Sequence, residues 1–176
     1  MIKRHLVAGI AVLSSFVVGG FTAEAQMMTG HDRLHGQHGA HGMGHDEYTM
    51  PGLRGVNTTD TEVDEMQTLF RNFTLIEREV INLENGIYTI TVTNDPDTYN
   101  ALVSHVTGMI ARVEAQDDPQ VIIQSPTLDV FFMRGAEIET EIEVTANGIA
   151  VIQTSNDPEL VASLQRHAAE VSDMVD

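Results

Sequence analysis

The 176-residue sequence contains no cysteine. It therefore offers no disulfide bond, no thiolate ligand for zinc or an iron–sulfur cluster, and no C-x-x-C-H site for covalent haem attachment. It also lacks the G-x-S-x-G, H-E-x-x-H, P-loop and Rossmann glycine patterns that mark common enzyme sites. These absences predict a protein that is not an enzyme, and the sequence points to no catalytic residue.

Basic side chains are scarce as well. The chain has 9 Lys and Arg against 26 Asp and Glu, for a formal net charge of −17, and Lys3 is its sole lysine. Such a surface repels phosphate groups, so we do not expect nucleic acids or anionic membranes as partners. It is compatible with a metal ion or a cationic protein partner, and equally with an acidic surface that only keeps the protein soluble.

The N-terminus has the layout of a secretory signal. Lys3 and Arg4 precede a short apolar stretch, and Ala23-Glu24-Ala25 gives the A-x-A pattern of a cleavage site. We therefore expect residues 1–25 to be a signal peptide, a periplasmic or secreted protein, and no stable membrane insertion after cleavage. Because the removed residues carry Lys3, Arg4 and Glu24, cleavage takes the net charge from −17 to −18.

Residues 26–58 are rich in Gly, His and Met and show no apolar periodicity, which predicts a disordered tail. Its histidines follow one another at spacings of 4, 3, 3 and 4, and are His31, His35, His38, His41 and His45. Met27, Met28, Met43 and Met50 lie among or beside them. Imidazole suits divalent copper, zinc or nickel, whereas the thioether favours cuprous copper. The combination predicts metal binding, with copper as the first choice.

The rest of the chain reads as two copies of one unit. Setting residue n against residue n + 62 needs no gap from Gln67 to Glu114, and Asn94-Asp95-Pro96 then meets Asn156-Asp157-Pro158. Asn85-Gly86 meets Asn147-Gly148 in the same register. We infer an internal duplication, with repeat 1 at residues 59–114, a linker at 115–124 and repeat 2 at 125–176.

Each copy is predicted to run helix, strand, tight turn, strand, helix. Thr59 or Asp60, Ser125, Asp95 and Asp157 are candidate helix N-caps, the last three each followed by proline. Asn-Gly is the strongest short signal for a hairpin turn, and Ile138 to Val144 alternates apolar and acidic residues as a half-buried strand does. The expected fold is α+β: two helix-hairpin-helix repeats about a pseudo-two-fold axis, with an antiparallel sheet and helices on one face.

Two histidines recur at the same place in the two copies. On a helical wheel, His105 and His167 both lie at the margin of the apolar stripe of their helix, and Met109 follows His105 by one turn. His105 and Met109 are candidate metal ligands, and His105 with His167 is a candidate haem site. The alternative is that each histidine packs at the edge of the core and makes one hydrogen bond.

Several stretches resemble a family of small exported proteins from alphaproteobacteria that carry a tandem NDP-x8-His pattern. They include PGLRGVNTTDTEVDEMQTLFRNF, LVSHVTGMIARVEAQDDPQVIIQSPTLDVFFMRGAEI and LQRHAAEVSDMV. The resemblance implies export and a duplicated architecture, and it implies no activity.

Three functions are consistent with the sequence. The first is a periplasmic, non-enzymatic protein that stores or delivers copper. The second is a haem-binding or redox-partner protein that uses His105 and His167. The third is an acidic binding or assembly module with no metal role.

Overall fold

The structure is a computed structural model that describes residues 49–175. It contains the helices α1 (Asp60–Arg71), α2 (Pro96–Ala115), α3 (Pro126–Arg134) and α4 (Pro158–Ser172). The strands are β1 (Ile76–Leu83), β2 (Gly86–Thr93), β3 (Glu139–Val144) and β4 (Gly148–Thr154). Three short 3-10 helices are η1 (Pro51–Leu53), η2 (Phe73–Leu75) and η3 (Gly135–Glu137). The predicted α+β class is confirmed. The signal peptide and residues 26–48 of the predicted tail lie outside the described residues. The last part of that tail, residues 49–58, contains η1, the buried Leu53 and a bridge from Gly55 to Val121 in place of the predicted disorder.

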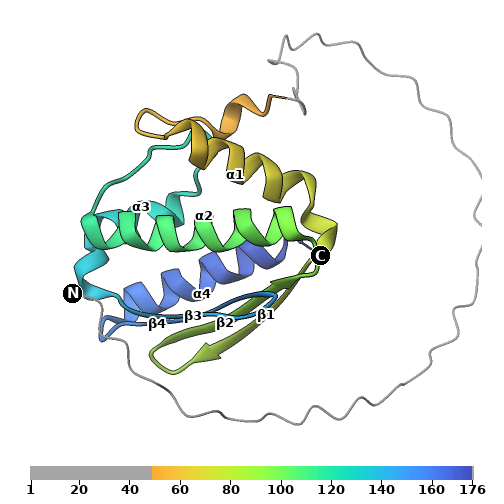
Figure 1. Cartoon of the computed structure of the whole chain (residues 1–176). Helices are drawn as coiled ribbons and strands as arrows, with labels where there is room; N and C mark the ends of the chain where they lie inside the picture. The colour runs from red at the N-terminus through yellow and green to blue at the C-terminus, as the bar shows by residue number, and fades with distance from the viewer. Residues whose placement is uncertain (1–48, 176) are drawn as a thin grey trace, which may run out of the picture. The chain divides into compact units, whose positions relative to one another are not determined.

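The four strands form one antiparallel sheet in the order β1-β2-β4-β3. The helices lie on one side of this sheet, as predicted, and Figure 1 shows the sheet nearly edge-on beneath them. None of the helices between residues 49 and 175 is long and apolar enough to cross a membrane.

Each helix begins directly after an N-cap residue that the sequence predicts. The Thr59 hydroxyl accepts from the Glu62 backbone N–H while the Glu62 carboxylate accepts from the Thr59 N–H, which makes a capping box. The remaining three cap side chains, each followed by a proline in the first helical turn, are Asp95, Ser125 and Asp157. Each satisfies backbone N–H groups that have no partner within the helix.

The hairpin turns differ from the prediction by one residue. Gly86 pairs with Leu83 as the first residue of β2, and Gly148 is the first residue of β4, so neither glycine is a central turn residue. A Cβ on Gly86 would lie 1.9 Å from the Gln153 carbonyl oxygen, and one on Gly148 would lie 2.0 Å from that of Thr91. Both glycines are needed because the two central strands approach closely there, and not because the turn requires a positive φ.

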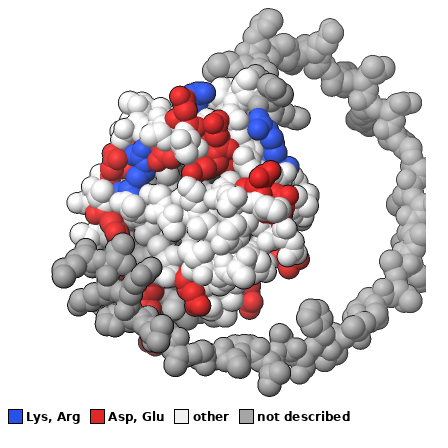
Figure 2. Space-filling model, in the orientation of Figure 1, with Lys and Arg blue, Asp and Glu red and all other residues white. Residues whose placement is uncertain are grey.

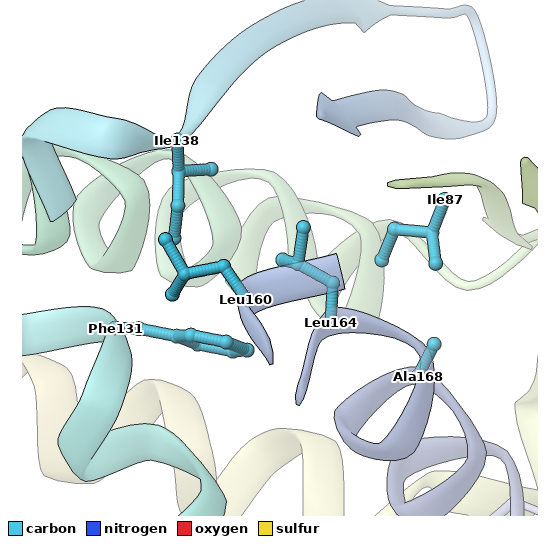
Figure 3. Packing of buried hydrophobic residues seen from close by; sticks show 6 residues of the cluster. All are labelled: Ile87, Phe131, Ile138, Leu160, Leu164 and Ala168. Atoms are coloured by element: carbon cyan, nitrogen blue, oxygen red, sulfur yellow. The ribbon is translucent and has the colours of Figure 1, made fainter. Parts of the chain in front are cut away.

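The core lies between the sheet and the helices, and it crosses the two halves of the chain. Helix α4 packs on β1 and β2, whereas α2 packs on β4, β2 and β3. One apolar cluster joins Ile87 of β2 to α3, α4 and the residue just before β3; its buried members are Ile87, Phe131, Ile138, Leu160, Leu164 and Ala168 (Figure 3). A second cluster joins Leu102 of α2 to Ile149 and Val151 of β4. Each hairpin is thus covered by a helix from the opposite half.

The predicted linker is fixed at the helical side of the molecule. Helix α2 runs one residue into it, to Ala115, and Val121 forms a single β-bridge with Gly55. Arg112 of α2 holds this region: its guanidinium binds the Glu62 carboxylate, the Asn57 carbonyl oxygen at 2.8 Å and the Asp117 carboxylate at 2.8 Å.

Candidate functional site

The two repeated histidines lie on α2 and α4, the two helices that pack on the sheet. Leu102 and Ala101 anchor α2 in the core, and His105 follows on the same side of the helix. Leu164 and Ala168, both fully buried, frame His167 on α4. The charge of His167 contributes to lowering the pKa of His105, so the two imidazoles interact electrostatically.

Both imidazoles are uncharged at neutral pH. Burial lowers the pKa of His105 to about 4; the charge of Glu62 opposes this, and His167 adds to it. Burial likewise lowers the pKa of His167 to about 4, with a further lowering from the charge of Arg78 and an opposing effect from Glu170. A neutral imidazole keeps a nitrogen lone pair, so each ring can accept a hydrogen bond or bind a metal ion.

The neighbours of His167 come from three elements. The ring of Phe131 on α3 meets it edge-on, with centroids 5.7 Å apart and an interplanar angle of 81°. Glu170 lies one turn along α4, with Oε2 3.9 Å from His167 Nδ1. Arg78 reaches in from β1 and donates to the Thr91 hydroxyl of β2 at 2.8 Å.

This interior is rich in polar atoms that lack partners. Among the described residues, the buried side-chain atoms without a hydrogen-bond partner are Arg78 Nε, His105 Nδ1 and Glu170 Oε2. Two of these groups act on the charge of His167 and the third is electrostatically coupled to it. Buried polar atoms are normally paired, so these three atoms are unusual. We call the group formed by His105, His167, Arg78 and Glu170 the polar centre.

The predicted site residues divide into two groups. His105 and His167 belong to the polar centre, and Met109 lies one turn beyond His105 on α2. The predicted ligands His31, His35, His38, His41, Met43 and His45 lie outside the described residues. From residue 49 to 175, no three His, Cys, Asp or Glu side chains gather closely enough to hold a metal ion.

Arg78 and Glu170 were not anticipated from the sequence, although a signal for Arg78 was present. In Ile76-Glu77-Arg78-Glu79-Val80 the arginine is in phase with the two apolar residues that face the core. A charged residue at an inward position of an alternating strand is an exception that indicates a buried polar site. Glu170 follows His167 by three residues, the spacing that places both on one helix face.

The adjacent pair Ser104-His105 does not form a catalytic couple. The Ser104 hydroxyl donates to Glu65 on α1, whereas the charged neighbours of His105 are Glu62 and His167. Comparison of the chain with models of protein families, with curated proteins and with solved structures finds no match.

Proposed function

We propose that this is an exported, non-enzymatic metal-binding protein that stores or delivers copper, with residues 26–58 as the binding segment. The observation that carries the proposal is the run of five histidines at spacings of 4, 3, 3 and 4, interleaved with methionines. A chain this rich in glycine can wrap several imidazoles and thioethers around one ion. The folded domain would carry the segment, and its negative charge would raise the local concentration of cations.

Copper loading of the mature chain tests this proposal. After passage through a desalting column, the chain should retain copper, and a variant with all five tail histidines replaced by alanine should lose it. A His105→Ala/His167→Ala variant is the matched control and should retain copper as the unchanged chain does. Retention by the five-alanine variant would contradict the proposal.

The tail methionines separate the two oxidation states of copper. Replacing Met27, Met28, Met43 and Met50 by leucine should weaken the binding of Cu(I) and leave that of Cu(II) nearly unchanged, because thioether sulfur prefers the softer ion. Competition with a chromogenic Cu(I) chelator measures the first, and competition with a Cu(II) chelator measures the second. Equal effects on the binding of both ions would show that the methionines are not copper ligands.

A second candidate function is haem binding by the polar centre. Two neutral imidazoles near one another, one of them with a buried and unpartnered Nδ1, support it. Haem titration of the mature chain would then give an intense Soret band that is lost in both His105→Ala and His167→Ala but kept in the five-alanine tail variant. Absence of a Soret band in the unchanged chain would reject this candidate without affecting the copper proposal.

We also propose that the domain arose by duplication and has a pseudo-two-fold axis at its centre. The register of β2 and β4 supports this relation. Thr89 pairs with Val151, its counterpart 62 residues on, and the same shift exchanges the pairs Gly86–Thr154 and Val92–Gly148. The axis would pass between the two middle strands, next to the glycines that let them approach.

A further inference from the structure

The face of the sheet turned away from the helices carries a distinct pattern of side chains. Since Ile87, Ile149 and Val151 point into the core, alternation directs the residues between them outward. On the middle strands these are Tyr88, Ile90 and Val92 of β2 and Ala150 and Ile152 of β4. The outward residues at the centre of the sheet are therefore mainly apolar, and Figure 1 shows no described helix over them.

The two edge strands border this apolar centre with carboxylates. Glu77 and Glu79 of β1 lie along one edge, and Glu139, Glu141 and Glu143 of β3 lie along the other. The strand register places four of these residues in one row across the sheet, because Glu79 pairs with Ile90, Ile90 with Ala150, and Ala150 with Glu143. In the described part of the chain, none of the five glutamates forms an ion pair.

Part of the acidic surface on the helical side differs from this face, because arginines pair with it. Figure 2 shows Asp and Glu over the helical layer next to Lys or Arg, and further acidic groups along the lower margin, where the sheet lies. On the helical side, Arg112 binds Glu62 and Asp117, and Arg134 binds Asp157 and Glu137. The sheet face therefore keeps uncompensated negative charge on both sides of an apolar stripe.

The dimensions of the stripe match a single helix. Four strands spaced by about 4.8 Å put the two rows of glutamates about 14 Å apart, and an α-helix with its side chains is about 10–12 Å across. From Tyr88 to Val92 the stripe is about 14 Å long, or between two and three helical turns. A helix lying along β2 and β4 would place an apolar face on the stripe and its flanks beside both glutamate rows.

We propose that this sheet face is the docking surface for a basic amphipathic helix of a partner protein, with apolar residues at i, i+3, i+4 and i+7 and Arg or Lys on both flanks. Charge complementarity selects this occupant. A second copy of the chain docking face to face would bring glutamate rows against glutamate rows, which is unfavourable. The inference goes beyond metal binding and does not depend on it.

The experiment measures binding of a fluorescein-labelled synthetic peptide of 18 residues, made of Leu and Arg in helical register, to the mature chain. A peptide of identical composition in scrambled order is its control, since an acidic protein attracts any cation. The ordered peptide should bind about tenfold or more tightly than the scrambled one, because only the ordered peptide presents an apolar face.

Matched variants locate the binding surface. Glu79→Lys with Glu141→Lys reverses one charge in each row, whereas Asp64→Lys with Glu114→Lys makes the same net change on exposed positions of α1 and α2. The first pair should weaken binding about tenfold more than the second. Tyr88→Thr with Ile152→Thr keeps strand-forming residues, removes the apolar contact and should also abolish the preference for the ordered peptide.

Three results would overturn the proposal. The first is equal binding of the ordered and scrambled peptides. The second is an equal effect of the two charge-reversal pairs, once circular dichroism shows that both are folded. The third is a dimer in sedimentation that dissociates in the Tyr88→Thr/Ile152→Thr variant, because that would assign the face to a second copy. The copper-loading result is independent of all three.

Discussion

At the scale of single residues, the two buried histidines make the stability of the protein depend on pH. Their pKa values are about 4 in the folded chain and near 6.5 when unperturbed, so between these values the unfolded chain binds protons that the folded chain does not. Their contribution to stability is complete above pH 6.5 and is lost as the pH falls toward 4.

The expected loss is about 2–3 kcal/mol for each imidazole, at 1.36 kcal/mol per pKa unit and allowing for the solvent that reaches His167. Urea unfolding at a series of pH values measures it. A His105→Leu/His167→Leu variant should lose the pH dependence above about pH 4.5, where the carboxylates contribute little. Below that, the salt bridge of Glu62, whose pKa is lowered to about 2, adds its own acid sensitivity, and the variant should keep this part. An unchanged slope in the variant would contradict this account.

Arg112 of α2 forms an ion pair with Glu62 of α1 and so links these two helices. Its side chain and that of Glu62 are only 13% and 17% exposed, and the hydrogen bond raises the pKa of Arg112 while it lowers that of Glu62. Replacing Arg112 by alanine leaves a largely buried carboxylate without its partner, so we expect a loss of about 2–4 kcal/mol in the free energy of unfolding.

Arg54 provides the control. It pairs with Asp60 at 3.2 Å, but the two side chains are 58% and 90% exposed, so Arg54→Ala should cost less than about 1 kcal/mol. Thermal unfolding of both variants gives the comparison. Similar losses for Arg112→Ala and Arg54→Ala would show that burial of the Arg112 pair is not what matters.

At the scale of elements, the ladder between β2 and β4 is limited by its two glycines. An alanine at Gly86 or Gly148 would place a Cβ about 2 Å from a backbone oxygen of the neighbouring strand, and backbone cannot move aside as a side chain can. Each substitution should therefore destabilise the protein by about 2 kcal/mol or more.

Gly108 of α2 is the matched control, because a Cβ there meets no atom within 4 Å. Gly108→Ala should stabilise the protein by about 0.5–1 kcal/mol through the better helix propensity of alanine. Denaturant titration of the three variants tests the ordering. Should Gly86→Ala and Gly108→Ala change stability in the same direction, the close approach of the two strands would not be the reason for the glycine.

The elements themselves were largely readable from the sequence. Thr59, Asp95, Ser125 and Asp157 are caps because their short polar side chains satisfy nearby N–H groups, which is a local property. The position of the turns was wrong by one residue because the Asn-Gly pattern has a second cause. Glycine also serves where two strands approach closely, and the sequence of one hairpin does not reveal its neighbour.

At the scale of the whole molecule, each hairpin is covered by a helix from the other half. Helix α4 packs on β1 and β2 more extensively than α2 does, so residues 49–119 alone would lack the main helix that covers their hairpin. We expect this fragment to be unfolded as a monomer and, under the duplication proposal, to gain structure by forming a symmetric dimer at high concentration.

Circular dichroism over a concentration series, with sedimentation equilibrium, tests this expectation. The full chain is the control and should show the same helical signal at every concentration. A fragment that is folded as a monomer would contradict the shared core, and one that remains unfolded at millimolar concentration would count against the duplication proposal.

The sequence by itself determined the class of the fold, the helix caps and the alternation of the strands. It also placed His105 and His167 at the margin of the apolar stripe of their helices. These depend on periods of two and 3.6 residues and on local hydrogen bonds, which neighbouring residues specify. Only the tertiary structure decided that Arg78 lies near His167, that Gly86 faces Gln153, and that Glu79 and Glu143 border one apolar stripe. Those relations depend on strand order and on which helix covers which hairpin, and such long-range pairings are set by the packing of the whole core.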